Sequence, residues 1–133
     1  MANMKLIGAK FTKVNAERNP DFSGKLSMDT NIKITELDRV KDSKDAAKIS
    51  YLFGIDYGEL GKISIEGSLF VTTDSKTVKE LIKLWKDKKV DTPEMIAITN
   101  LIIQKASIRA FELEEELGLP IHIKLPSLSI KKD

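Results

Sequence analysis

The sequence has 133 residues, of which 41% are apolar and 32% charged, so it predicts one domain, residues 1–133, with a core of its own. It contains no cysteine, which excludes a disulfide scaffold, a thiolate metal site and a cysteine nucleophile, and it contains one histidine. The net charge is +2, and only three of the 22 basic residues are arginine, which argues against a dedicated nucleic-acid surface.

Neither a membrane span nor a signal peptide is indicated by the sequence. No apolar run is long enough to cross a bilayer, and the N-terminal residues lack the apolar stretch of a secretory signal. We therefore expect a soluble, cytoplasmic protein.

Four segments of the first half alternate between apolar and polar residues, which is the period of a strand with one wet face. They are residues 6–16, 26–34, 49–57 and 63–71. In the first of them Ile7, Ala9 and Phe11 are expected to share one face. Clean alternation favours an antiparallel meander.

A short turn joins the third and fourth strands, and its length fixes their register. A three-residue loop, residues 58–60, pairs Tyr57 with Gly61 and sets Ile55 opposite Ile63. A four-residue loop would put the two apolar faces on opposite sides of the sheet, so we prefer the shorter loop.

The second half of the chain predicts two helices, of which the first is short. Its cap is Asp74 or Ser75, and its apolar residues follow helical spacing along one face. These apolar residues are Val78, Leu81, Ile82 and Trp85.

A longer helix follows, with Thr92 as its N-cap and Pro93 in its first turn, and it ends at Leu117 before Gly118. Its first half is apolar almost all round, so one sheet face cannot cover it and a partner subunit is expected. The residues expected at this oligomer interface are Trp85, Ile98 and Ile102. Residues 119–128 contain two prolines and predict an extended apolar tail.

Groups that could carry chemistry are few. Four glutamates in residues 112–116 lack the Glu-x-x-His spacing of helix-borne di-metal sites and are interpreted as a solvated face. His122 is interpreted as a solvated or hydrogen-bonded strand residue. The lysines of residues 79–89 are interpreted as a solvated face, because no aromatic platform for nucleic acid accompanies them. We expect no enzyme, no catalytic residue, no metal and no cofactor.

Three large apolar side chains, Phe22, Leu52 and Phe70, stand apart from the predicted core. Leu52 and Phe70 have the strand parity of the sheet's other face. Exposed apolar groups of this kind mark a partner surface more often than chance. They are therefore candidates for a binding or oligomer surface.

The order of elements resembles that of the SecB-type export chaperones. Gly118-Leu119-Pro120, followed by Leu125-Pro126, looks like that family's Gly-Phe-Pro with a second proline six residues on. Residues 25–30 (Lys-Leu-Ser-Met-Asp-Thr) are similar to its second strand, and residues 67–70 (Gly-Ser-Leu-Phe) to its Gly-x-Phe strand end. Residues 17–20 (Glu-Arg-Asn-Pro) stand where the family has an acidic, proline-containing segment. The resemblance spans nearly the whole chain.

The resemblance implies an α+β fold: a four-stranded antiparallel sheet followed by two helices, assembled as a homo-dimer or homo-tetramer. It also implies a holdase that uses no ATP and binds unfolded or non-native polypeptides in apolar grooves, with protein export as one role. The residues expected to line the groove are Phe22, Tyr51, Leu52, Phe70, Leu119, Leu125 and Leu128.

The chain departs from the family's export members at two places. Those members dock on the SecA motor through acidic residues, including a glutamate early in the fourth strand, where this chain has Lys62-Ile-Ser-Ile-Glu66. Their acidic C-terminal tail is replaced here by Lys131-Lys132-Asp133. SecA docking is therefore in doubt, and a SecB-like holdase of another system, such as a toxin–antitoxin pair, fits equally. The alternative is an oligomeric binding domain for one specific protein partner, without general holdase activity.

Overall fold

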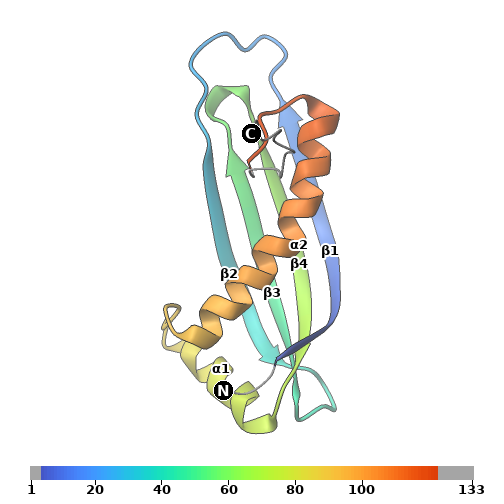
Figure 1. Ribbon diagram of the computed structural model, residues 1–133, viewed down its shortest axis with the longest axis vertical. Helices are drawn as coiled ribbons and strands as arrows, with labels where there is room; N and C mark the ends of the chain where they lie inside the picture. Colours follow the sequence, from blue (N-terminus) through green and yellow to red (C-terminus); the bar gives the residue numbers. More distant parts are fainter. Residues whose placement is uncertain (1–3, 123–133) are drawn as a thin grey trace, which may run out of the picture.

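A computed structural model of the chain describes residues 4–122. Four strands form one antiparallel sheet; the long helix α2 crosses one of its faces obliquely, and α1 lies at one end (Figure 1). This confirms the predicted fold class. None of the helices within residues 4–122 is long and apolar enough to cross a membrane. The elements are β1 (Lys5–Arg18), β2 (Asp29–Arg39), β3 (Ala46–Asp56), the 3-10 turn η1 (Gly58–Leu60), β4 (Gly61–Thr72), α1 (Ser75–Lys86) and α2 (Pro93–Leu117).

The strand order is β1-β4-β3-β2, so only the last three strands form a meander. A full meander would place β1 beside β2, and this part of the prediction is wrong. The link between β1 and β2 instead crosses the end of the sheet, where the backbone N–H of Asn19 donates to the carbonyl of Leu60 at 2.7 Å (Figure 1). As a result, β1 and β2 are the two edges of the sheet.

Strand β1 carries two register shifts against β4, one between Leu6 and Gly8 and one between Phe11 and Lys13. A bulge interrupts the alternation of side chains, because the extra residue has no partner on the neighbouring strand. Ile7 falls in the first shift, whereas Phe11 pairs with Gly67. The single face predicted for β1 is therefore broken.

The turn between β3 and β4 has the predicted length and register. The N–H of Tyr57 donates to the carbonyl of Gly61 at 2.9 Å, and Ile55 pairs with Ile63. Gly58 has φ +68° and Gly61 φ +156°, a region that side chains with a Cβ rarely enter. Two glycines at these positions allow the three-residue loop to close with both apolar faces aligned.

Both helices begin at predicted caps, and α2 also ends where predicted. The carboxylate of Asp74 accepts from the N–H of Thr77 at 2.8 Å, and these hydrogen bonds hold the pKa of Asp74 below its usual value. The hydroxyl of Thr92 accepts from the N–H of Met95 in the first turn of α2, and Gly118 ends α2 at φ +66°. Side-chain caps and a left-handed glycine satisfy helix-end groups that would otherwise be unpaired.

The core lies between α2 and the inward face of β3 and β4. Ile98 and Ile102 are fully buried there, on the chain's own sheet. A side chain without accessible surface cannot add area to an oligomer contact, so their assignment to an oligomer interface is corrected. The buried apolar residues of α2 are Met95, Ile98, Ile102, Ala106, Ala110 and Leu113, and those of β3 and β4 are Ala46, Ala47, Ile49, Tyr51, Phe53, Ile55, Ile63, Ile65, Leu69 and Val71.

Candidate functional site

An open groove of about 910 Å³ lies between the edge strand β2, the end of α1 and the first turns of α2. We call it the β2 groove. Its size falls within the range of ligand pockets in proteins. Its lining residues are Ile32, Lys33, Ile34, Thr35, Trp85, Lys86, Lys88, Val90, Ile96, Thr99 and Asn100.

The floor of the β2 groove comes from the edge position of β2. Ile32 pairs with Phe53 and Ile34 pairs with Tyr51, so both isoleucines lie on the sheet face that carries α2. Their partners are fully buried, but the isoleucines are only partly buried. Because β2 is the last strand and α2 crosses the sheet obliquely, apolar surface stays open along this edge.

The opposite wall follows from the way α1 ends. The N–H of Lys88 donates to the carbonyl of Trp85 at 3.0 Å, and Lys88 has φ +58°, which turns the chain back. Val90 follows this turn, and α2 then starts after Thr92. The reversal places the ends of two helices beside β2, with the ring of Trp85 between them only partly buried.

The β2 groove is positively charged. Lys33, Lys86 and Lys88 line it, and no acidic side chain does. Among residues 4–122 none of these three lysines takes part in an ion pair. Apolar walls beside unpaired ammonium groups suit a ligand that is apolar in part and acidic in part.

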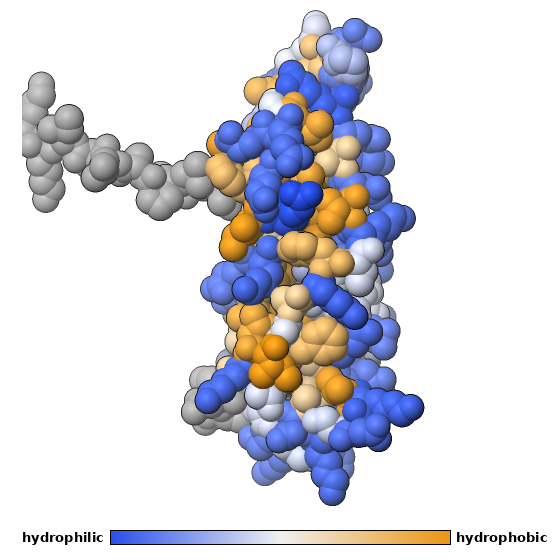
Figure 2. Space-filling view, turned by 90° about the vertical axis from the view of Figure 1, so that its right-hand side faces the viewer, coloured by the Kyte–Doolittle hydropathy of each residue, from blue (hydrophilic) through white to orange (hydrophobic). Residues whose placement is uncertain are grey.

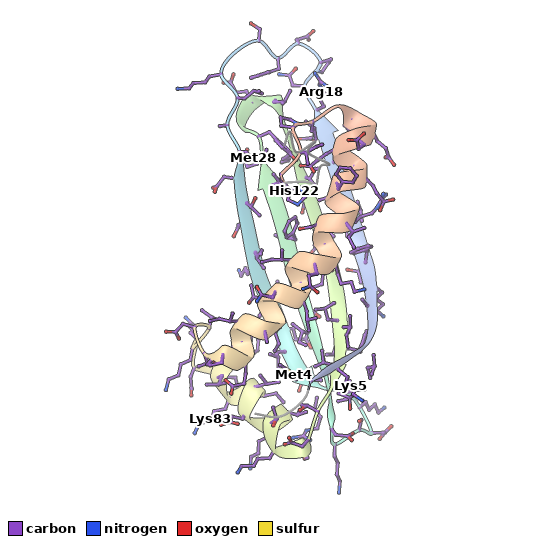
Figure 3. The ribbon with its side chains drawn as sticks, in the orientation of Figure 1. Met4, Lys5, Arg18, Met28, Lys83 and His122 are labelled. Carbon is purple, nitrogen blue, oxygen red and sulfur yellow. The ribbon has the colours of Figure 1, made fainter. Side chains whose placement is uncertain are left out.

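A second cluster, at the other end of α2, joins Tyr57, Glu114 and His122; we call it the tail anchor. Glu114 is fully buried. Its carboxylate accepts hydrogen bonds from the hydroxyl of Tyr57 and from the backbone N–H of His122, the latter at 3.0 Å. It also pairs with Nδ1 of the His122 ring at 2.7 Å. His122 lies between α2 and β3, where its ring meets Phe53 edge-on (Figure 3). The prediction of a solvated glutamate face is therefore wrong for Glu114, while Glu112 and Glu116 lie at the surface near Arg109.

The tail anchor is built to hold the chain in place. Burial first, and then the hydrogen bond and charge of Glu114, raise the pKa of Tyr57 far above its usual value, so the phenol stays a donor. The guanidinium of Arg18 donates to the carbonyls of Leu117 and Gly118 at 3.0 and 2.8 Å (Figure 3). Within residues 4–122 no group of three or more His, Cys, Asp or Glu could hold a metal ion. These contacts fix where the chain leaves α2.

The structure does not bring the predicted groove residues to one surface. Tyr51 and Leu119 are buried in the core, 2% and 5% exposed, so the prediction that they line an open groove is corrected. Leu52 pairs with Glu66 and Phe70 with Lys48, on the sheet face opposite α2. Phe22 packs partly against the core from the β1–β2 link. Leu125 and Leu128 lie outside the described residues.

Sequence reasoning missed most of the β2 groove. Ile32 and Ile34 are apolar positions of the alternating segment 26–34, but this alternation does not show that β2 is an edge. Trp85, expected at an oligomer interface, lines the groove. The available signal was the apolar surplus around the first turns of α2, where Met95 and Ile98 are buried but Ile96 is 47% exposed.

Comparison with known proteins gives a fold and no sequence family. No family model matches the sequence, and no curated protein matches it. Among solved structures the chain is similar to the SecB-like chaperone Rv1957 of Mycobacterium tuberculosis, which was solved in complex with a ChAD peptide from the antitoxin HigA1, Rv1956. The identity is 12%, the TM-score is 0.59, and the match covers 97% of this chain and 93% of that chain. The chain therefore has a SecB-like fold.

Proposed function

We propose that this chain is an ATP-independent molecular chaperone that acts in the cytoplasm, binds non-native polypeptide segments in the β2 groove and carries out no reaction on them. The observation that carries the proposal is the groove itself, about 910 Å³ of open, largely apolar space beside an edge strand. Non-native segments differ from folded surfaces in their exposed apolar side chains and unpaired backbone. The β2 groove offers partners for both.

The fold comparison supports a polypeptide as the ligand. The solved SecB-like neighbour holds a peptide, and this chain matches its fold over nearly the full length of both. A polypeptide ligand also suits a groove that is open along a strand, because an extended segment can enter from the side and continue beyond it.

The antitoxin peptide of that neighbour favours a second candidate function. In it, the chain is a binding domain for one specific protein partner, such as a component of a toxin–antitoxin system, and has no general holdase activity. The two candidates use the same groove. They differ in the range of clients, which is a measurable property.

We also propose that the chain assembles with copies of itself through its β1 side. Ile7 is 60% exposed and Phe11 is 42% exposed on this edge strand, whose outer backbone groups have no partner strand within residues 4–122. Figure 2 shows this side, where apolar side chains form an interrupted stripe along the long axis between charged ones. Pairing of two β1 edges would satisfy the backbone groups and cover this apolar surface.

Assembly is tested by measuring the mass of the protein in solution. A Phe11→Glu variant should lower the mass of the assembly at micromolar concentration, because it places charge in the proposed contact. Leu26→Glu, which changes a 59% exposed side chain outside β1, is the matched control. A wild-type chain that stays a monomer would contradict the proposal.

The function is tested by following light scattering while denatured clients are diluted into buffer with the chain and without nucleotide. A panel of clients with unrelated folds separates the two candidates. Suppression for most clients at near-stoichiometric ratios supports the general holdase, and suppression confined to a single partner supports the specific binder. Unchanged scattering for every client, together with no binding of any peptide, would contradict both.

A further inference from the structure

The charge of the β2 groove narrows the kind of segment that fits it. Its three lining lysines come from two sides: Lys33 from β2, and Lys86 and Lys88 from the last residue of α1 and the turn after it. No acidic residue lines the groove, and none of these lysines has an ionic partner among residues 4–122. Unpaired charges of one sign beside apolar walls create a potential that favours an anionic ligand group.

The edge of β2 sets the geometry of that ligand. Four consecutive residues of β2, from Ile32 to Thr35, line the groove, so the groove runs along the strand edge and meets side chains of both faces. Ile32 and Ile34 lie on the α2 face, whereas Lys33 pairs with Leu52 and lies on the opposite face. The ladder with β3 shifts register between Ile34 and Glu36, which limits any added strand to the part of β2 before this bulge.

We infer that the β2 groove binds an extended segment in which apolar residues alternate with acidic ones. This inference rests on the proposed function and specifies the client for it. As a strand added to β2, such a segment turns every second side chain toward Trp85, Val90 and Ile96. The side chains between them lie on the face of Lys33. Lys86 and Lys88 lie on the helix side of the groove, so they attract an acidic residue that stands beyond the paired positions, at the end of the segment near α1, where strand alternation no longer applies.

Other occupants carry the wrong charge. The C-terminal tail of the same chain, residues 123–133, contains three lysines and one aspartate. The β1 edge of a second copy contains Lys5, Lys10 and Lys13. Either would bring ammonium groups toward ammonium groups, which disfavours binding at low salt. An acidic segment of another protein is the occupant that complements the groove.

The test uses three labelled twelve-residue peptides in which leucine alternates with aspartate, glutamine or lysine. Binding to the full chain is measured by fluorescence anisotropy at low and high salt. We expect the aspartate peptide to bind roughly five- to tenfold more tightly than the glutamine peptide, and the lysine peptide most weakly, because two or three exposed ion pairs each add a small increment. The preference should shrink at high salt.

Two charge-reversal variants locate the effect. Lys86→Glu/Lys88→Glu should reverse the order of the aspartate and lysine peptides. Lys76→Glu/Lys79→Glu makes the same change of charge on exposed residues of α1 that do not line the groove, and should leave the order unchanged. Equal affinity for all three peptides, or a reversal in both variants, would overturn the inference.

The remaining outcomes separate this inference from the function beneath it. If none of the peptides binds but client aggregation is still suppressed, the acidic preference is wrong and the chaperone proposal stands. If peptides do not bind and aggregation is unaffected, both fail. If the Leu125→Ser/Leu128→Ser variant binds all three peptides more tightly than the wild type, the tail is the occupant of the groove. If peptide affinity falls as the chain assembles, a second copy is the occupant. Either result overturns the inference.

Discussion

The two ends of α2 meet the sheet in opposite ways. At the C-terminal end the tail anchor closes the core: Glu114 has no accessible surface and bonds with Tyr57 and His122. At the N-terminal end the β2 groove stays open, with apolar walls and lysines that have no ionic partner among residues 4–122. A buried polar group is tolerated where its bonds are complete. On the proposed function, the C-terminal end of α2 serves stability and its N-terminal end serves binding.

The largest expected effect is the removal of the central carboxylate of the tail anchor. Glu114→Ala leaves the Tyr57 hydroxyl and the His122 N–H buried without their acceptor, and should lower the free energy of unfolding by about 3–5 kcal/mol. Denaturant unfolding measures it. Glu115→Ala, one residue along the same helix but exposed, should change the free energy by less than about 0.5 kcal/mol. Similar losses in both variants would show that the anchor is not a stabilising unit.

The second largest effect is the loss of unfolding free energy when a buried isoleucine of α2, rather than an exposed one, is shortened. Ile98→Ala empties space in the core and should cost about 3 kcal/mol of unfolding free energy. Ile108→Ala changes a side chain that is 63% exposed and should be nearly neutral. Thermal and denaturant unfolding provide the measurement. A neutral Ile98→Ala would mean that α2 does not pack on the chain's own sheet.

Alkaline pH should lower the free energy of unfolding through two buried tyrosines. Burial, together with Glu114, raises the pKa of Tyr57, and burial raises the pKa of Tyr51. Because the folded-state values lie above the unfolded value of about 10, the stabilisation is complete below about pH 10 and is lost as the pH rises beyond it, by roughly 1.4 kcal/mol per pH unit for each such tyrosine.

Phenylalanine variants isolate this effect from the titration of lysines, which all variants share. Tyr57→Phe should flatten the fall in unfolding free energy between about pH 10 and 11, and Tyr57→Phe/Tyr51→Phe should flatten it further. An unchanged slope in both variants would show that neither phenol is held protonated by the fold.

The smallest expected effect lies in the turn after α1, beside the β2 groove. Lys88 has φ +58°, a conformation that costs a side chain with a Cβ about 1 kcal/mol. Lys88→Gly removes this strain but adds freedom to the unfolded chain, so we expect a gain of roughly 0.5 kcal/mol in unfolding free energy. Lys89→Gly, without a positive φ to relieve, should give no gain. Calorimetry compares the two, and equal shifts would contradict the account of this turn.

Local signals predicted the local structure well. The turn at residues 58–60, the caps Asp74 and Thr92 and the stop at Gly118 each depend on a few neighbouring residues, and the structure confirms them. The alternation of apolar and polar residues along β3 and β4 predicted their register, because that pattern also depends on neighbouring residues. The place of β1 depends instead on the path of a link that no short pattern describes.

The candidate site was harder to predict, because it depends on which surfaces stay uncovered. Nothing next to Glu114 separates it from three other glutamates, although its spacing of four from the buried Ala110 continues the inward face of α2. The β2 groove exists because β2 is an edge and α2 crosses the sheet obliquely. Both facts arise from the tertiary arrangement, so Ile32 and Ile34 read as ordinary core residues in the sequence.

The most direct test of the central claim compares Ile96→Ser with Ile108→Ser in the aggregation assay without nucleotide. Both variants replace an exposed isoleucine of α2, 47% and 63% exposed, but only Ile96 lines the β2 groove. We predict that Ile108→Ser suppresses client scattering as the wild type does, and that Ile96→Ser needs roughly tenfold more protein for the same suppression, the loss expected when apolar contact of about 1.4 kcal/mol is removed. Equal suppression by the two variants would contradict binding in the β2 groove.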